Sequence, residues 1–195
     1  LHRREQALAQ SQTSPVEPAQ ALKQLAALQG QHRDLQQQLL AASFEHQGGP
    51  LESGGGVNLI RVDNSLQCPA LPLNAPALIR PQAAGWRPWR IDDQSPTWEL
   101  PKEKVLLQLF MRGNPFRAGK NSRENWPELV QQLIQRERLA GLVVYGSPYL
   151  WHELQAMLPS DLPAAYSPGQ MPAAQAMALA QLGLVGHAHE GGFTD

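Results

Sequence analysis

Two apolar segments of the chain share one pattern of hydrophobic and polar positions. Residues 105–111 are almost wholly apolar and run into a polar Gly-Asn-Pro turn, and residues 142–145 are followed by a similar turn at Gly146. Segments of this length that are apolar on both faces are typical of strands inside a parallel sheet. Between them, residues 122–138 carry apolar side chains at i, i+3, i+4, i+7 and i+8, which predicts an amphipathic helix. The order strand, loop, helix, strand predicts a parallel α/β sheet.

Shorter patterns on either side extend this sheet. Residues 57–62 and 163–166 are predicted strands, and residues 150–158 and 170–182 are predicted helices. When strands and helices alternate along a chain, the helices cover both faces of the sheet. The expected fold class is therefore α/β, with three αβα layers built around a mostly parallel sheet.

Prolines are concentrated in residues 67–101. Each proline removes a backbone donor and biases the preceding residue away from helix. This segment is therefore predicted to be irregular, with short edge strands at residues 77–79 and 89–91. Its tryptophans are expected to cover the sheet, and stacking on a bound ligand is the alternative.

The first part of the chain is helical in pattern and more polar. Residues 19–29 and 31–47 are predicted as two helices, and Gly30 is expected to end the first of them. A coiled coil is the alternative, but the apolar pattern lasts too few heptads to support it. Residues 1–10 look like the tail of a helix, because they favour helix and lack an N-cap.

These patterns predict three parts along the chain. The parts are a helical arm or linker at residues 1–47, an α/β domain at residues 55–186 and a loosely held tail at residues 187–195. Because the chain opens on Leu1 in the middle of a helical pattern, we expect the arm to continue from an upstream domain.

Composition excludes some classes of partner. A net charge of −1 gives no support for binding to nucleic acid or to an anionic membrane, and no apolar run reaches the roughly 18 residues that span a bilayer. The single cysteine, Cys68, excludes an internal disulfide and is compatible with a reducing compartment. A cytoplasmic location is expected, while an export signal upstream of Leu1 would leave export open.

Four short motifs, taken in their order and spacing, resemble the C-terminal α/β domain of glycoside hydrolase family 3, in particular that of bacterial two-domain β-N-acetylhexosaminidases and related β-glucosidases. The resemblance covers roughly residues 55–186. It implies a flavodoxin-like fold for this part of the chain. The motifs are Asn-Leu-Ile-Arg-Val-Asp-Asn at 58–64, Arg-Gly-Asn-Pro-Phe-Arg at 112–117, Gly-Ser-Pro-Tyr at 146–149, and Ala-Tyr at 165–166 followed by Gln-Ala at 175–176.

The resemblance implies that the catalytic residues lie elsewhere. The family carries its acid/base histidine and its nucleophilic aspartate on an N-terminal (β/α)8 barrel, and the barrel motifs do not occur in this chain. We therefore expect no catalytic residue and no cofactor here, and no hydrolase activity from this chain alone. The implied partners are the barrel of the same polypeptide and, through the full-length enzyme, a glycan with a terminal β-linked N-acetylhexosamine or glucose.

Candidate residues for contact with substrate or barrel follow the predicted strands, because ligands gather at the carboxyl ends of parallel strands. Arg112 is the best-placed polar group, although an ion pair with a nearby carboxylate is an equally good interpretation. The candidates are Asp63, Arg112, Asn114, Phe116, Ser147 and Tyr149.

Two alternatives remain open. His187, His189 and Glu190 have the spacing of metal ligands, but they are too few for a closed site on a Gly-rich tail, and no metal is expected. The other alternative for the whole chain is a free-standing flavodoxin-like module that binds or interacts and has no hydrolase activity.

Overall fold

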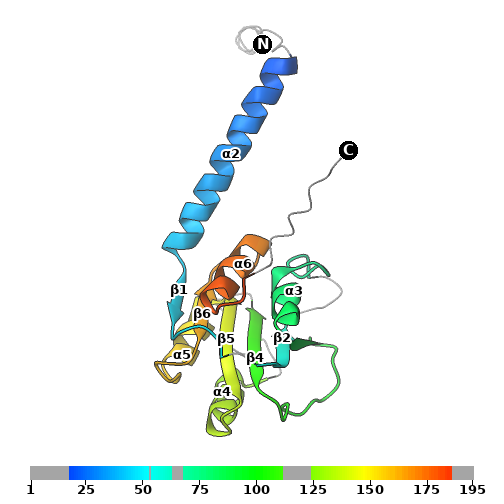
Figure 1. Cartoon of the computed structure of the whole chain (residues 1–195), viewed down its shortest axis with the longest axis vertical. Coiled ribbons are helices and arrows are strands. Elements are labelled where there is room, and N and C mark those ends of the chain that lie inside the picture. Colours follow the sequence, from blue (N-terminus) through cyan, green and yellow to red (C-terminus); the bar gives the residue numbers. More distant parts are fainter. Residues whose placement is uncertain (1–17, 53, 63–67, 112–123, 186–195) are drawn as a thin grey trace, which may run out of the picture. The chain divides into compact units, whose positions relative to one another are not determined.

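A computed structural model describes residues 18–52, 54–62, 68–111 and 124–185 (Figure 1). The chain divides into two compact units, Leu1–Leu39 and Leu40–Asp195. The predictions for residues 1–10 and for the tail at 187–195 fall outside the described residues. The elements are α2 (Pro18–Ala42), β1 (Glu45–Gln47), β2 (Gly56–Arg61), α3 (Pro76–Ala83), β3 (Trp86–Ile91), β4 (Val105–Met111), α4 (Trp126–Gln135), β5 (Leu139–Gly146), α5 (Pro148–Gln155), β6 (Ala164–Ser167) and α6 (Pro172–Gln181).

The second unit is built on one six-stranded sheet with the order β1-β6-β5-β4-β2-β3. All neighbouring pairs are parallel except β1 and β6, which are antiparallel. Without β1, the parallel strands have the order of a doubly wound, flavodoxin-like sheet, in which the second strand along the chain lies outside the first. The predicted α/β class and mostly parallel sheet are confirmed.

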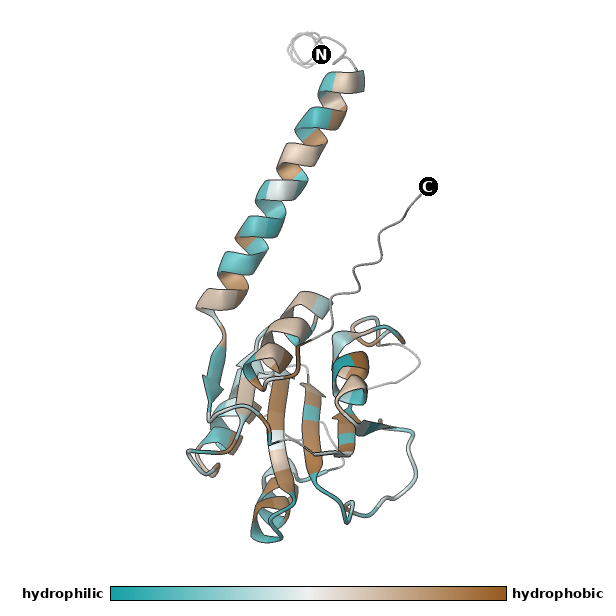
Figure 2. Cartoon of the chain, in the orientation of Figure 1, coloured by the Kyte–Doolittle hydropathy of each residue, from teal (hydrophilic) through white to brown (hydrophobic). Residues whose placement is uncertain are grey.

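Two cores form on the opposite faces of this sheet. One face packs against α4 and α5, through side chains such as Val130 and Trp151. The other face packs against α3 and α6, through side chains such as Leu78 and Leu179. Strands buried on both faces are mostly apolar, which explains the hydrophobic colour along most of β4 and β5, with one polar band in β4 at the buried Gln108 (Figure 2).

The predicted helix at residues 122–138 is shorter in the structure, where α4 begins at Trp126. Asn125 caps it by accepting a hydrogen bond from the Glu128 amide, and Pro127 lies in the first turn, where a missing N–H is harmless. Arg138 lies beyond the helix and donates to the carbonyl oxygen of Pro101 at 3.0 Å. The predicted apolar face of the helix is confirmed, because Val130 and Leu133 are fully buried.

Leu133→Ala is expected to lower the free energy of unfolding by about 2–5 kcal/mol, because truncation of a buried leucine leaves a cavity. Leu133 is 1% exposed in the core beneath α4. Gln131→Ala on the exposed side of the same helix should change stability by no more than about 0.5 kcal/mol. Urea denaturation of both variants measures the difference, and equal losses would mean that the buried face of α4 is wrongly assigned.

The prediction of an edge strand at residues 77–79 is wrong, because these residues lie in α3. Pro76 is at the start of this helix, where its fixed φ favours the first turn. Pro81 cannot donate to the carbonyl of Ala77, so this oxygen is released from the helix ladder. It accepts hydrogen bonds from Asn58 Nδ2 at 2.9 Å and from Gln108 Nε2 at 2.8 Å. Side chains of the sheet thus replace the missing helical bond.

The two-helix prediction for residues 19–47 is also wrong. α2 continues through Gly30 to Ala42, and residues 45–47 form β1 instead of the end of a helix. A glycine inside a helix costs only about 1 kcal/mol, which is too little to break a helix with good formers on both sides. β1 exists because its backbone pairs with β6, a long-range partner that local pattern does not show. The edge strand predicted at 89–91 is confirmed within β3.

Candidate functional site

At the carboxyl edge of the sheet, the connections that follow β2 and β4 diverge to opposite faces. The chain leaves β2 toward α3 on one face of the sheet and leaves β4 toward α4 on the other face. In doubly wound sheets this divergence opens a crevice that serves as the usual place for a ligand or partner. A candidate site is therefore expected at these strand ends.

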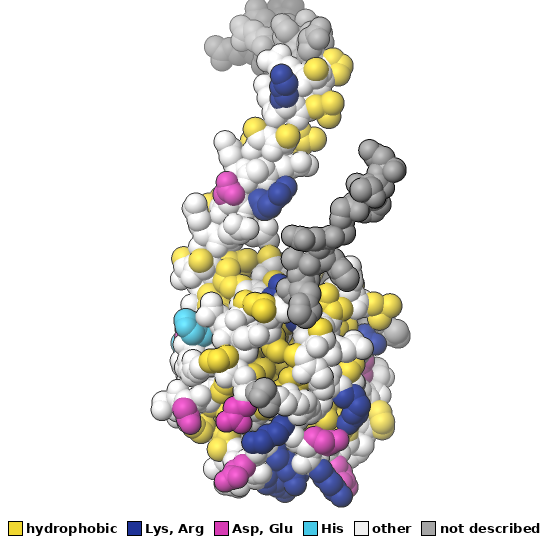
Figure 3. Space-filling view, in the orientation of Figure 1, with side chains coloured by type: hydrophobic (Ala, Val, Ile, Leu, Met, Phe, Trp, Pro, Cys, Tyr) yellow, Lys and Arg dark blue, Asp and Glu magenta, His cyan; other side chains and the backbone are white. Residues whose placement is uncertain are grey.

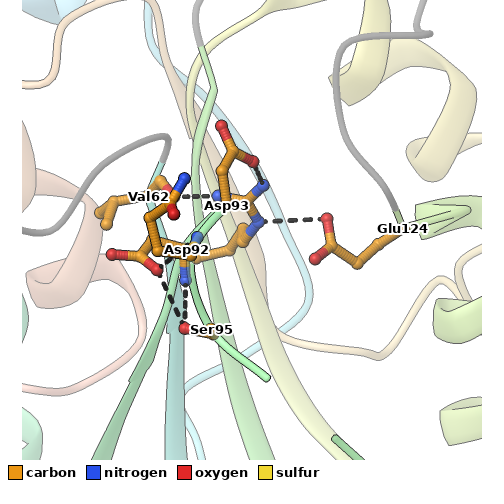
Figure 4. Close-up of polar contacts among 7 residues, drawn as sticks. Val62, Asp92, Asp93, Ser95 and Glu124 are labelled. Atoms are coloured by element: carbon orange, nitrogen blue, oxygen red, sulfur yellow. Dashed lines mark hydrogen bonds and ion pairs between the residues drawn. The ribbon is translucent and has the colours of Figure 1, made fainter. Parts of the chain in front are cut away.

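Arg61 is the last residue of β2, and its side chain is only 1% exposed. Its Nη2 lies 2.5 Å from Asp93 Oδ1, and its Nε lies 3.1 Å from Glu124 Oε2 (Figure 4). Its Nη1 donates to the backbone oxygen of Val62. Three elements converge on one guanidinium, because Asp93 follows β3 and Glu124 precedes α4.

This group carries one more negative charge than positive charge, since one cation faces two carboxylates. Glu124 is largely covered, with a side chain 12% exposed, whereas the Asp93 side chain is 44% exposed. Arg61 therefore fixes the position of a carboxylate that remains accessible at the carboxyl edge. Such a carboxylate can accept hydrogen bonds from a hydroxyl or an amide, or pair with a cation.

The segment after β3 is held by a local turn centred on Asp92. Its Oδ1 accepts from the Gln94 amide at 2.9 Å and from Ser95 Oγ at 3.0 Å, and Ser95 Oγ accepts from the Asp92 amide at 2.9 Å (Figure 4). A side chain that bonds its own backbone two or three residues on is typical of a tight turn. The turn fixes the path of the chain immediately around Asp93.

An open pocket of about 430 Å³ lies between this loop and α4. Trp98 forms part of the apolar wall of the pocket. Its ring stacks on that of Trp126, with ring centroids 6.4 Å apart. Trp89 and Trp98 also pack against the core, as their predicted covering role requires. Among the described residues, Trp126 Nε1 is a buried donor with no hydrogen-bond partner. The polar part of the wall comes from Asp92, Ser95, Thr97, Glu124, Asn125, Glu128 and Gln132.

Behind this edge, a buried polar network ties the sheet to α3 and α6. Tyr145 donates to Gln108 Oε1 at 3.1 Å, and Gln108 donates to Asn58 Oδ1 at 2.7 Å. Burial raises the pKa of the Tyr145 hydroxyl, so it remains a protonated donor. Gln175 accepts from the Ala77 amide at 3.1 Å, an amide that the first turn of α3 leaves without a helical partner. Because these buried polar groups form hydrogen bonds with one another, their role is structural.

Only two of the six predicted site residues lie in the part of the chain that the structure describes. Ser147 is buried and caps α5, its Oγ accepting from the Leu150 amide at 3.3 Å. Tyr149 is 63% exposed in the first turn of that helix. The positions outside the described residues are those of Asp63, Arg112, Asn114 and Phe116.

Sequence reasoning missed the ion-pair group of Arg61, Asp93 and Glu124. The available signal was Arg61 itself, a charged residue in a predicted strand whose other residues, apart from Asn58, are apolar. A buried arginine requires carboxylate partners, although the sequence does not say which carboxylates they are.

The chain is similar to a known protein family. The model of the bacterial glycosyl hydrolase family 3 C-terminal domain matches residues 51–183. The chain belongs to this family. The match covers every element from β2 to α6 and leaves α2 and β1 outside it. No curated protein matches the chain.

Within the described residues, no three histidine, cysteine or carboxylate side chains lie close enough together to hold a metal ion. The described helices include none that is long and apolar enough to cross a membrane. His187, His189 and Glu190 lie outside the described residues.

Proposed function

We propose that this domain is the accessory domain of a family 3 glycoside hydrolase. In this proposal it packs on a catalytic (β/α)8 barrel of the same polypeptide, with the carboxyl edge of its sheet beside the active site. The full-length enzyme removes terminal β-linked N-acetylhexosamine or glucose residues. The domain supplies a wall of the substrate site and no catalytic group.

The buried Arg61 with its two carboxylates is the observation that carries this proposal. Burying a charge is costly, and a core of apolar side chains is often as stable as a buried ion pair or more so. A buried arginine at the end of β2 therefore suggests a use beyond stability. Holding the exposed Asp93 carboxylate at the switch point is such a use, because a sugar hydroxyl, an acetamido N–H or a barrel cation could bind it.

The same geometry argues against catalysis by this group. Glycoside hydrolysis needs two carboxyl groups on either side of the scissile bond, one as acid and one as nucleophile or base. Asp93 and Glu124 instead bind a single guanidinium that lies between them, so the space that a sugar would need is filled by Arg61. The carboxylate pair must come from elsewhere in the enzyme.

The test compares the 195-residue chain with the protein translated from the complete upstream reading frame. Hydrolysis of an aryl β-N-acetylglucosaminide and of an aryl β-glucoside is measured for both proteins. We expect turnover of at least one substrate by the longer protein and none by this chain. Turnover by this chain that disappears in Asp93→Asn would overturn the proposal, and a reading frame without a barrel would favour a free-standing flavodoxin-like module.

In the longer protein, Asp93→Asn should lower kcat/KM by about tenfold, the effect of losing one charge-assisted hydrogen bond. Asp161→Asn is the matched control, because it removes an exposed carboxylate just before β6. This position is at the amino ends of the parallel strands, opposite the carboxyl edge. Its kinetics should equal those of the wild type. Equal kinetics for both variants would show that the carboxyl edge does not face the substrate site.

A further inference from the structure

α2 carries a heptad repeat that becomes visible only because the helix is continuous. Its 25 residues pass through Gly30 without a break, so one register applies from Pro18 to Ala42. Apolar side chains follow the alternating spacing of three and four residues that defines heptad positions a and d. The seam consists of Leu25, Leu28, His32, Leu35 and Leu39, with Ala21 and Ala42 one step beyond either end.

The leucines of this seam are exposed in the structure. Leu25 is 52% exposed, Leu28 is 61% exposed and Leu35 is 55% exposed. Figure 3 shows hydrophobic side chains spaced along this helix among polar ones. Helices in water take most of their stability from packing of an apolar face and not from intrinsic propensity. A helix with this exposed seam is expected to pack against a partner.

The period of the seam indicates what kind of partner this is. A spacing of 3.5 residues per turn matches the supercoil of two helices, whereas a helix lying on a globular domain follows a spacing of 3.6 with a wider apolar face. Gly30 fits the same pattern, because it falls at position f, which is farthest from a partner helix. A glycine at this position lowers the stability of the helix itself and leaves the apolar contacts of the seam unchanged.

The residues beside the seam favour a second copy of the same helix. Positions e and g, whose charges normally select or reject partners, hold glutamines throughout apart from Leu22. Two copies therefore meet without repulsion between like charges. The charged residues of the helix, Lys23, Arg33 and Asp34, are at positions f, b and c, outside the contact. The glutamines are Gln24, Gln29, Gln31, Gln36 and Gln38.

The residues of the seam also favour one of the two possible orientations, parallel or antiparallel, of the paired helices. Parallel pairing in register places each leucine against its own counterpart and confines the polar residue to a single layer at His32. Antiparallel pairing about Gly30 places His32 against Leu28 and Leu39 against Ala21, which buries less apolar surface. A single polar residue at position a is a known device for fixing register in parallel pairs.

We propose that α2 is a dimerisation element that forms a parallel two-stranded coiled coil with α2 of a second copy of this chain. The 195-residue protein should then sediment at about twice its monomer mass of 21.5 kDa at high concentration. Replacing Leu28 and Leu35 together by Glu should give a monomer. Replacing Lys23 and Arg33 together by Glu makes a larger change of charge outside the seam and should leave the dimer intact.

Seam geometry is tested by crosslinking in a background where Cys68, the only cysteine, is replaced by Ser. Leu25→Cys should form a disulfide-linked dimer on oxidation, because facing a positions in a parallel pair bring the Cα atoms within the distance that a disulfide spans. Gln37→Cys at position f should not crosslink. His32→Leu should tighten the dimer by tenfold or more, because it removes the one polar layer.

Three outcomes would overturn the proposal. The first is a wild-type chain that remains monomeric over the concentration series, with an α/β domain that melts normally. The second is crosslinking at position 37 as readily as at position 25, since contact would then not depend on the seam. The third is a monomer when the upstream reading frame is included, since another part of the polypeptide would then cover the seam.

Discussion

Asp93→Asn combined with Glu124→Gln is expected to lower the free energy of unfolding by about 3–5 kcal/mol, the usual cost of leaving a buried charge without its partner. Both substitutions keep the size of the side chain and remove its charge. Arg61 would remain 1% exposed with neutral amides in place of its two carboxylates. Chemical denaturation of the double variant against the wild type measures the loss.

Adding Arg61→Met to this double variant is the decisive control. An unbranched apolar side chain removes the stranded charge, and replacement of a buried ionic group by apolar residues is often neutral or stabilising. The triple variant should therefore recover most of the lost stability. If it is no more stable than the double variant, the loss comes from disturbed loops around Asp93 and Glu124 and not from the charge of Arg61.

The sequence predicts those helices and strands whose burial pattern stays the same along their whole length. β4 is buried on both faces and α4 is buried on one face, so the apolar period alone identifies them. β1 could not be found in this way, because Glu45–Gln47 is polar and is a strand only through its pairing with β6. α3 was missed because its prolines suppress helix locally, while hydrogen bonds from Asn58 and Gln108 compensate for Pro81.

The candidate site shows the same division between local and long-range information. The sequence shows that Arg61 is a charged residue in a mostly apolar strand, but its partners lie 32 and 63 residues further along the chain. Which carboxylates reach it depends on the strand order, and a single sequence does not give that order. Asn58 and Gln175 belong to the motifs that carry the family resemblance, and their contacts explain their presence through packing and not through catalysis.

Trp151→Ala is expected to cost about 3–5 kcal/mol of stability, the range for truncation of a fully buried aromatic side chain. Trp151 is 0% exposed and joins three elements of the domain. Its ring stacks on Tyr166 of β6 with centroids 5.9 Å apart, and its Nε1 donates to Glu45 Oε2 of β1 at 2.7 Å. Removing it should therefore weaken the docking of α5 and of β1 together.

Trp151→Phe separates the two contributions, because it keeps an aromatic ring beside Tyr166 and removes the donor to Glu45. The loss of one hydrogen bond to a charged group should cost about 1.5–3 kcal/mol, and the loss of ring volume adds a smaller packing term. If the bond to Glu45 holds β1 in place, amides of β1 and β6 should exchange faster with solvent in Trp151→Phe, while those of β4 remain protected. Glu45→Gln should reproduce that local effect at a smaller cost, since an amide oxygen still accepts from the indole. Uniformly faster exchange across the sheet in Trp151→Phe would show instead that this side chain supports the core as a whole and that β1 depends on its backbone pairing alone.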